Sequence, residues 1–373
     1  WNDIKDIEIK DIAYNSKNSQ DNYIFVAIKG ETTDGHKYVK NAYERGTRIF
    51  VIEEEVNLPD DSIKIFVKDS REALSMMSAN FFNHPSKEMV VIGITGTKGK
   101  TTSSNYIKNI LECSGRPTGI IGTNGIIYKD IVETTVNTTP ESYELHRILR
   151  KMLDNGVKHV VMEVSSGGLM MKRVSNIDFD LGAFTNISPD HIGPREHPSF
   201  QHYLETKASL FNLVKHGIIN VDDDKSDYII KTASCPLESF SIKQPSDFQA
   251  VDIELSISLE LLGSKFICKT SSGDYKFDLN SPGIFNIYNA LLAIAVGKHL
   301  NIETSAVKNA LLNTSVEGRV EVLPILDYAS VIIDFAHNGV SLENILSTLK
   351  EYKPNRLICL IGSVGMRAQI RRK

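Results

Sequence analysis

Residues 90–102 read Val90-Val91-Ile92-Gly93-Ile94-Thr95-Gly96-Thr97-Lys98-Gly99-Lys100-Thr101-Thr102, an apolar run that enters a glycine-bearing turn. The apolar side chains that follow recur at helical spacing as far as Leu111, and Gly115 with Pro117 is a good helix stop. The stretch therefore predicts a strand, a tight turn and a helix in direct succession.

A turn of this kind suits phosphate groups. Glycines let backbone N–H groups approach phosphate oxygens, and the helix N-terminus adds a favourable dipole. Lys100 is expected to reach the outer phosphates of a nucleotide, and the Thr101 hydroxyl to bind Mg²⁺. The general pattern has a glycine five residues before Gly99, where this chain has Ile94. A chance Gly-Lys-Thr at an ordinary turn is the alternative. The candidate nucleotide-binding loop comprises Gly96, Thr97, Gly99, Lys100, Thr101 and Thr102.

Composition bounds the class of protein. The 373 residues suffice for two or three domains of roughly 100–200 residues each. A net charge of −4 argues against a nucleic-acid partner bound through bulk charge. The four cysteines lie far apart without C-x-x-C spacing, which disfavours a zinc site or a disulfide framework and fits a reducing cytoplasm. No apolar run approaches the ~18 residues of a membrane span. We expect a monomer, and leading residues before Trp1 are expected to be absent.

Three blocks follow one another along the chain. Residues 1–87 mix short strands with helices, and the cluster at 83–86 is typical of a linker. Residues 88–317 alternate apolar strands with amphipathic helices, which predicts an α/β fold with a parallel sheet covered on both faces. Within this block, residues 247–280 alternate in a way that favours antiparallel strands, as in a side sheet.

Residues 318–373 form the third block. A strand at 329–335, a helix at 341–352 and a strand at 356–361 are predicted there. An α/β domain normally needs roughly 100 residues or more, and this block has only about half of that. We therefore expect an incomplete C-terminal domain.

Further motifs resemble those of the Mur ligases and their folate-tailing relatives, beginning with the loop form Gly96-Thr97-x-Gly99-Lys100-Thr101-Thr102. The resemblance implies a three-domain architecture: a small N-terminal α/β domain that binds the UDP end of the substrate, a central P-loop ATPase domain and a Rossmann-like C-terminal domain. The other motifs occur in the order that family shows: Met162-Glu163-Val164-Ser165-Ser166, Thr185-Asn186-Ile187-Ser188-Pro189-Asp190-His191, Lys207-Ala208-Ser209-Leu210-Phe211, Ser281-Pro282-Gly283-x-Phe285-Asn286-x-x-Asn289-Ala290, Gly318-Arg319-x-Glu321 and Asp334-Phe335-Ala336-His337.

Two features are similar to the branch of the family that adds the third amino acid to the UDP-muramoyl-dipeptide precursor of peptidoglycan. One is Asn137-Thr138-Thr139-Pro140-Glu141-Ser142. The other is the N-terminal block that contains Tyr14-Asn15-Ser16-Lys17 and Asp34-Gly35-His36. The resemblance places the segment that selects the amino acid beyond Lys373, so diaminopimelate and L-lysine both stay open as substrates.

The reaction that this resemblance implies is activation of a carboxylate by ATP as an acyl phosphate, followed by attack of an amine. Lys100, Glu163, His191 and Lys207 are the implied catalytic residues. Glu163 and His191 would coordinate Mg²⁺ at the carboxyl ends of neighbouring strands, where open parallel sheets bind ligands. Carboxylate and hydroxyl oxygens suit this cation, and imidazole is less usual. Lys207 is implied to be carbamoylated, which turns a cation into an anion able to bind a second Mg²⁺.

The remaining roles also come from the resemblance. Asn289 is implied to contact adenine, Asp334 the ribose, and Arg319 to lie near the ATP phosphates. Ser16 would contact the UDP end of the substrate. Residues expected to hold the muramoyl-peptide and its diphosphate are Thr138, Thr139, Ser165 and Arg173.

Each of these residues has a plainer alternative. Glu163 could be a strand-end cap, His191 an ordinary loop histidine, and Lys207 a solvated helix lysine. Asn289 could be a helix N-cap and Arg319 part of a surface salt bridge. Serine and threonine are common in loops, where they cap the local backbone.

Four positions depart from the usual pattern of the family: Gly167, Met171, Glu317 and Met366. They would fit a paralogue that acts on a modified precursor. Two further hypotheses stay open at this point. One is a related ligase with another acceptor, either D-Ala-D-Ala or a glutamate tail. The other is a nucleotide-binding module without ligase activity.

Overall fold

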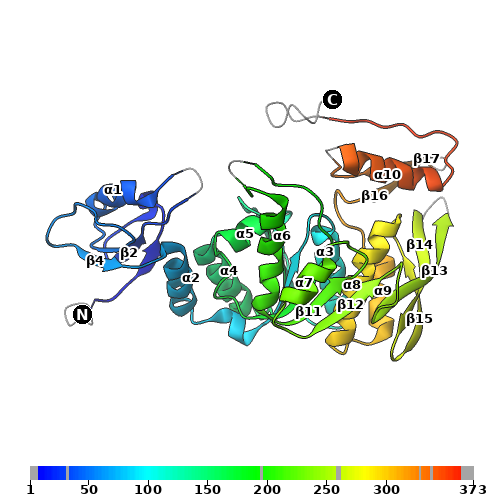
Figure 1. Cartoon of the computed structure of the whole chain (residues 1–373), viewed down its shortest axis with the longest axis horizontal. Coiled ribbons are helices and arrows are strands. Elements are labelled where there is room, and N and C mark those ends of the chain that lie inside the picture. The colour runs from blue at the N-terminus through cyan, green and yellow to red at the C-terminus, as the bar shows by residue number, and fades with distance from the viewer. Residues whose placement is uncertain are drawn as a thin grey trace.

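The computed structural model describes residues 7–30, 33–193, 196–257, 262–326, 329–336 and 339–362. His337 and the departure at Met366 lie outside the described residues. Three sheets follow one another along the chain, as the colour sequence of Figure 1 shows. In the part of the chain that is described, no helix is both long and apolar enough to cross a membrane.

The N-terminal sheet has four parallel strands in sequence order, which are β1 (Asp11–Ala13), β2 (Tyr23–Val26), β3 (Ile49–Ile52) and β4 (Ile63–Phe66). The 3-10 turns η2 (Ser16–Asn18) and η3 (Gly35–Tyr38) and helix α1 (Val39–Glu44) connect them. Phe25 and Phe50 are buried between this sheet and α1. Helix α2 (Ser70–Phe81) leads toward the central sheet and begins at the N-cap Asp69, whose carboxylate accepts from the backbone N–H groups of Arg71 and Glu72.

The central sheet has eleven strands in the order β15-β14-β13-β12-β11-β10-β5-β9-β6-β7-β8. From β13 to β6 neighbouring strands run parallel, as the alternating sequence pattern predicts. The parallel strands are β5 (Val90–Thr95), β6 (Thr118–Gly122), β9 (His159–Glu163), β10 (Phe179–Phe184), β11 (Val214–Asn220), β12 (Leu237–Ser241) and β13 (Phe248–Ile257).

Antiparallel strands extend both ends of this sheet. Strands β7 (Gly125–Tyr128) and β8 (Ile131–Glu133) follow β6 at one end. Strands β14 (Leu262–Thr270) and β15 (Gly273–Leu279) continue β13 at the other. The predicted antiparallel segment at 247–280 is thus confirmed, and it continues the main sheet instead of standing apart from it.

Helices cover both faces of the central sheet. Because side chains alternate along a strand, Val91 packs into one core cluster and Ile92 into the other. Helices α3 (Lys100–Cys113), α8 (Ile284–His299) and α9 (Thr304–Asn313) contribute to the cluster around Ile92. The opposite face carries α4 (Ser142–Asp154), α6 (Phe200–Ala208) and α7 (Ser226–Thr232). Shorter elements near these helices are η4 (Pro85–Glu88), α5 (Ser166–Met170) and η5 (Ser209–Asn212).

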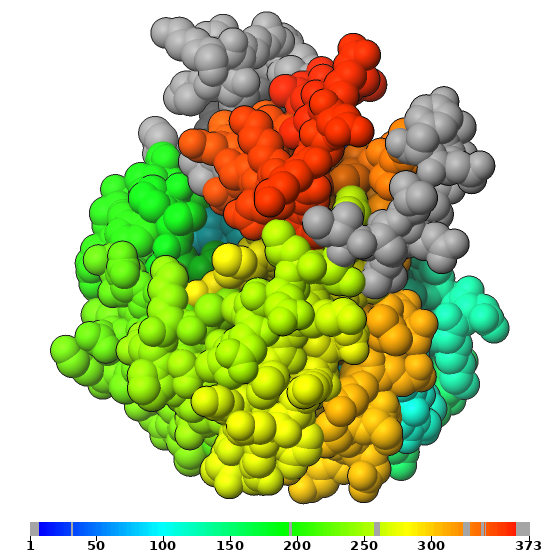
Figure 2. All heavy atoms as spheres, turned by 90° about the vertical axis from the view of Figure 1, so that its right-hand side faces the viewer, coloured from blue at the N-terminus to red at the C-terminus, as the bar shows by residue number. Residues whose placement is uncertain are grey.

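The third sheet pairs β16 (Glu321–Leu326) with β17 (Ala329–Ile333) and precedes α10 (Gly339–Glu351). Figure 2 shows this orange-to-red part seated over the yellow-green strands of the central sheet. The Tyr352 hydroxyl donates to the Gly263 carbonyl oxygen there, at 2.9 Å. The strand predicted at 356–361 is wrong for the described chain: these residues are exposed and form no strand, because a strand needs a neighbouring strand to receive its backbone hydrogen bonds.

Candidate active site

The loop between β5 and α3 has the geometry that its glycines predict. Gly99 is the N-cap of α3 with a φ of 87°, in the left-handed region. A Cβ atom at Gly99 would lie 2.5 Å from the Asn289 side-chain oxygen, so both the backbone and the neighbouring helix require glycine. Two loop amides are engaged inside the protein: the Thr97 N–H donates to the Asn186 carbonyl and the Lys98 N–H to the Asn186 side chain. Asn186 therefore holds the first half of the loop against the end of β10.

Lys100 begins α3 and its amine lies over the loop. Its Nζ donates to the carbonyl oxygens of Gly96 at 2.8 Å and Thr97 at 3.1 Å. Burial lowers the pKa of Lys100, and the nearby charge of Glu163 acts against that shift. The amine is thus held at the mouth of the loop, where phosphate groups of a nucleotide would lie.

Glu163 ends β9 and is 1% exposed. Its carboxylate accepts from the Thr101 hydroxyl at 2.9 Å, from the Thr123 N–H at 3.0 Å and from the Thr123 hydroxyl at 3.0 Å. A hydroxyl and a carboxylate therefore stand side by side next to the phosphate loop. Such hard oxygen ligands are the kind that Mg²⁺ prefers.

Lys207 lies on α6 and is 1% exposed, so the solvated helix lysine expected from spacing alone is wrong. Tertiary packing overrides the local pattern, because α6 presses this side chain against the phosphate loop. Its Nζ donates to the Gly96 carbonyl at 3.0 Å and lies 4.7 Å from the centre of the Tyr203 ring. Burial, followed by the charge of Lys100, moves the pKa of Lys207 well below its usual value.

His191 sits in the loop after β10 with a φ of 55°. Its Nδ1 lies 2.8 Å from a Glu196 carboxylate oxygen, and both side chains are about half exposed. Next to them, His197 is 2% exposed, and its Nδ1 lies 2.9 Å from Nδ1 of His202. Burial and the neighbouring His202 lower the pKa of His197 to about 4, so this imidazole is neutral at neutral pH.

Asn289 lies inside α8, one and a half turns after the helix begins, so its interpretation as an N-cap is wrong. The N-cap of α8 is Gly283, and the φ of 95° at this position explains why the residue is glycine. The Asn289 side chain is 6% exposed, accepts from the Ser103 hydroxyl at 3.1 Å and donates to the Asn286 side chain at 3.2 Å. The adenine contact implied for Asn289 would require its amide to be shared with these partners.

Arg319 and Asp334 belong to the third block and line the same cavity as Lys100 and Asn289. The Arg319 guanidinium lies 4.3 Å from the centre of the Phe335 ring, and burial lowers its pKa against the opposing charges of Asp334 and Glu163. The Asp334 carboxylate accepts from the N–H groups of Val320 at 2.8 Å and Ala336 at 2.7 Å. Arg319 stacks on Phe335 and lines the cavity, and among the described residues it forms no salt bridge.

The residues expected to bind substrate lie in different parts of the structure. Thr138, Ser165 and Arg173 line a cavity beside Lys100. Thr139 is fully buried: its hydroxyl donates to the Glu163 carbonyl at 2.9 Å and accepts from the Ser165 N–H at 2.9 Å. Ser16 lies in the 3-10 turn η2 beside the N-terminal sheet, and it lines neither this cavity nor the larger one next to it.

Arg173 is held by a carboxylate that also reaches the N-terminal part of the chain. One Glu141 oxygen lies 3.4 Å from Arg173 Nε and 3.2 Å from Nη1 of Arg71 on α2. All three side chains are mostly buried, with 12–13% of each exposed. Glu141 therefore ties α2 to the substrate side of the site.

Two cavities meet over the phosphate loop. The larger one runs from the loop past Asn289 to Arg319 and Asp334. The smaller one extends toward Arg173 and Lys207. Four residues line both cavities, namely Lys100, Thr138, Ser165 and His191. The site can therefore hold a phosphorylated nucleotide on one side of the Lys100 amine and a second, anionic ligand on the other.

Several lining residues were missed by the sequence analysis. Thr123 follows the end of β6 and Asp222 follows the end of β11. Applying the rule on the carboxyl ends of strands to every strand, and not only to β9 and β10, would have found both. Tyr288 donates to the Asp222 carboxylate at 2.8 Å from a helix 66 residues further along the chain, a pairing that no local pattern signals.

The chain is similar in sequence to a family of ligases over nearly its whole length. The model of the Mur ligase catalytic domain matches residues 8–82, that of the Mur ligase middle domain residues 94–297, and that of the Mur ligase glutamate ligase domain residues 318–373. Among curated relatives, the UDP-N-acetylmuramoyl-L-alanyl-D-glutamate–2,6-diaminopimelate ligase of Clostridium perfringens is 39% identical over 98% of this chain and 75% of its own length. The ligase of the same name from Caldanaerobacter subterraneus is 36% identical over the same shares.

Solved structures agree with this fold. A UDP-N-acetylmuramoyl-L-alanyl-D-glutamate–2,6-diaminopimelate ligase superposes with a TM-score of 0.80 at 23% identity, over 98% of this chain and 74% of that one. The MurF ligase of Thermotoga maritima in complex with ADP gives a TM-score of 0.64 at 18% identity, over 93% and 76%. These structures share the overall fold of this chain.

Proposed function

Since this chain belongs to the Mur ligase family of ATP-dependent, amide-forming ligases, we propose that it joins 2,6-diaminopimelate to UDP-N-acetylmuramoyl-L-alanyl-D-glutamate in peptidoglycan precursor synthesis. In this reaction a substrate carboxylate attacks the terminal phosphorus of ATP, giving an acyl phosphate and ADP. The amine then attacks the acyl carbon and releases inorganic phosphate. Both steps need crowded negative charges to be held in line.

One observation carries the proposal: Lys100 lies where the two cavities meet. A nucleotide in the larger cavity and a carboxylate from the smaller one would approach each other across this amine. Its charge would stabilise the transferred phosphoryl group while the loop fixes the nucleotide. Preorganised cations of this kind are often the largest contribution to catalysis of such steps.

Mg²⁺ fits the donor set beside the loop. Thr101 and Glu163 would hold it, because their oxygens already lie together and belong to the hard class that this ion prefers. When bound, the ion neutralises charge on the phosphates. His191 is the weaker candidate ligand, since its Nδ1 is paired with Glu196 and imidazole is less usual for Mg²⁺.

A carbamate on Lys207 also fits this site. Carbamoylation joins CO₂ to a neutral amine with loss of one proton, so it requires a lysine of low pKa. Lys207 meets that requirement through burial and the neighbouring charge of Lys100. The product would be an anion next to a buried cation, which replaces repulsion by attraction and supplies oxygen atoms for a second Mg²⁺.

The other assignments follow the two cavities. We assign the nucleotide to the larger cavity, with the base near Asn289, the ribose near Asp334 and the phosphates near Arg319. The muramoyl-peptide end of the substrate belongs in the smaller cavity with Thr138, Ser165 and Arg173. Thr139 would act by positioning Ser165, and Ser16 would meet the distant UDP end.

The domain division 1–87, 88–317 and 318–373 is likewise a proposal, supported by the three separate sheets. The reaction would take place in the cytoplasm, which fits the four free thiols of the chain. We propose a monomer as the working unit, because one chain contributes both cavities. Light scattering of the purified protein tests this last point.

The experiment that tests the function measures phosphate release from ATP with UDP-N-acetylmuramoyl-L-alanyl-D-glutamate and a panel of amines. Release that depends on both the UDP-substrate and diaminopimelate is expected. Release with L-lysine alone would change the amine, and release with D-Ala-D-Ala or glutamate on their own acceptors would favour a related ligase. If a protein that binds ADP releases phosphate with none of them, it is a nucleotide-binding paralogue.

A further inference from the structure

A second group of polar side chains lies at the opposite edge of the central sheet from the nucleotide. His216 is near the start of β11, Glu238 near the start of β12, and His299 at the end of α8. Asn220, at the far end of β11, lines the nucleotide cavity. The four residue steps from His216 to Asn220 span about 13 Å of a parallel strand. This group therefore belongs to neither of the cavities described above.

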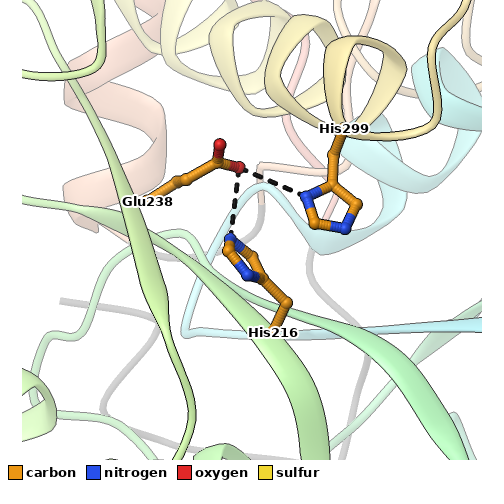
Figure 3. A group of neighbouring side chains, drawn as sticks. All are labelled: His216, Glu238 and His299. Carbon is orange, nitrogen blue, oxygen red and sulfur yellow. Dashed lines mark ion pairs between the residues drawn. The ribbon is translucent and has the colours of Figure 1, made fainter.

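Sheet register explains why these side chains meet. Glu238 is the partner of Ile218 on β11, and side chains alternate along a strand, so His216 and Glu238 share one face of the sheet. Ile218 packs against α8 on that face, and the last turn of α8 brings His299 onto the same spot. Figure 3 shows the carboxylate of Glu238 directed between the two imidazoles.

The distances within the group match those around a bound metal ion. One Glu238 carboxylate oxygen lies 3.3 Å from Nε2 of His216 and 3.5 Å from Nδ1 of His299. In a tetrahedral zinc site with bonds near 2.0–2.1 Å, neighbouring ligand atoms are about 3.4 Å apart. The three ligand atoms all lie within 4.8 Å of one another, so a small ring rotation completes the arrangement.

Hydrogen bonding leaves two of these atoms unused. His216 Nε2 and the inner Glu238 oxygen are buried, and neither has a hydrogen-bond partner of good geometry among the described residues. Buried polar atoms normally find a hydrogen-bond partner, whereas these two face each other only at the ion-pair distance of 3.3 Å. A cation between them would satisfy both at once, and the carbonyl-rich end of α8 favours positive charge there.

From this geometry we propose that His216, Glu238 and His299 form a binding site for a divalent transition-metal ion, with Zn²⁺ as the expected occupant. Two imidazole nitrogens and one carboxylate are a borderline donor set that favours Zn²⁺, Co²⁺ or Ni²⁺ over Mg²⁺. Three protein ligands leave the fourth position to water. The ion would fasten the end of α8 to β11 and β12. The other end of α8 carries Asn286 and Asn289 at the nucleotide cavity, so the ion would also steady that side of the site.

Cobalt titration of the purified protein tests the site. Excess Mg²⁺ and saturating ADP are present, so the oxygen ligands of the nucleotide cavity are already occupied. We expect one equivalent of Co²⁺ to give visible absorption bands without a sulfur-to-cobalt charge-transfer band, which excludes the free cysteines. Zn²⁺ should displace this Co²⁺ and raise the Tm.

Two matched variants decide where the ion binds. Glu238→Gln keeps the shape of the side chain and should weaken Co²⁺ binding roughly tenfold or more, and His299→Ala should do the same. Glu54→Gln is the control, because Glu54 belongs to the other grouping of ligand residues, with Asp34 and His36. It should bind Co²⁺ as the wild type does. ADP affinity and circular dichroism check that each variant is folded.

The result that overturns the proposal is equally specific. If wild-type protein binds no Co²⁺ or Zn²⁺ under these conditions, or if Glu238→Gln and His299→Ala bind them with unchanged affinity, the site does not exist. If only Glu54→Gln loses Co²⁺ binding, the ion binds at the group of Asp34, His36 and Glu54 beside the N-terminal sheet.

Discussion

Lys100 and Lys207 donate hydrogen bonds to the same acceptor, the carbonyl oxygen of Gly96, at 2.8 and 3.0 Å. Two amines that donate to one oxygen lie within about 6 Å of each other, and two ammonium groups at that separation repel when they are shielded from water. Burial, and after it the charge of Lys100, lowers the pKa of Lys207 well below its usual value, which lessens this repulsion. The lowered pKa favours the neutral, nucleophilic form of the Lys207 amine.

Ligase activity should therefore depend on CO₂ and on pH in a defined direction. The lowered pKa of Lys207 leaves a larger neutral fraction near neutral pH than an ordinary lysine has. That fraction falls as pH is lowered through the pKa of Lys207, so the activity gained on adding bicarbonate should fall in the same direction. Lys207→Met should lose at least about a hundredfold in kcat and all bicarbonate response.

Carbon-13 NMR after exposure to labelled CO₂ checks this prediction directly. A carbamate signal should appear in the wild type and be absent from Lys207→Met. Lys215→Met is the matched control, because Lys215 has an exposed side chain paired with Asp180. If the labelled signal persists in Lys207→Met, the modified residue lies elsewhere.

Removing the amine of the phosphate loop should abolish turnover while the fold is kept. Lys100→Ala is expected to reduce kcat by roughly a hundred- to a thousandfold, as loss of a preorganised charge typically does. Lys108→Ala, about two turns further along the same helix and paired with Glu112, should change kcat little, because Lys108 lines neither cavity. Phosphate release and thermal melting measure the two effects. Wild-type turnover in Lys100→Ala would contradict the phosphate role.

Gly99 can be tested against a second glycine of similar backbone. Gly99 and Gly115 have φ values of 87° and 78°, but only at Gly99 does a Cβ atom meet another group. Gly115→Ala should therefore cost only the backbone strain, roughly 1–2 kcal/mol. Gly99→Ala should in addition displace Asn289 and weaken ADP binding about tenfold or more. Calorimetric titration with ADP distinguishes them, and equal ADP affinity in both variants would refute the packing argument.

The contact of Glu141 with Arg71 on α2 and with Arg173 should affect substrate binding more than the rate of the chemical step. Glu141→Gln removes the negative charge that holds Arg71 and Arg173. The free energy of interaction between residue 141 and the two arginines should weaken by about 1–3 kcal/mol. The KM for the UDP-substrate should then rise several-fold, with kcat within about a factor of two. Glu144→Gln is the control, because Glu141 is the N-cap of α4 and Glu144 lies in the first turn of that helix, paired with Arg147. A large fall in kcat at unchanged KM would mean that Glu141 acts on the reaction itself.

Local sequence was a good guide where the structure is local. The β5–α3 loop needs only glycine chemistry and one helix start, and both were visible in residues 90–102. The parallel sheet followed from the alternation of apolar runs and amphipathic helices in residues 88–317. The strand at 356–361 failed because pairing depends on a neighbouring strand, which no single segment encodes.

The site was harder to predict wherever distant segments meet. Burial of Lys207 depends on α6 lying against the loop, so spacing alone gave the opposite answer. The pairing of Tyr288 with Asp222 and of Glu141 with Arg71 joins parts of the chain 66 and 70 residues apart. The His216, Glu238 and His299 group has the same origin. It also contains no cysteine, so a search based on cysteine spacing could not find it.

Asn289 reaches the nucleotide cavity from α8, whereas Arg319 and Asp334 reach it from the block that follows. ATP would thus connect the central block with the third block as well as react. Bringing the two blocks together around ATP would offset part of the binding free energy of the contacts between ATP and the protein. The measured affinity for nucleotide then understates the strength of those contacts by the cost of closure. A mutation at Gly318 that makes the connection between the two blocks more flexible would weaken ATP binding, although Gly318 itself would not contact ATP.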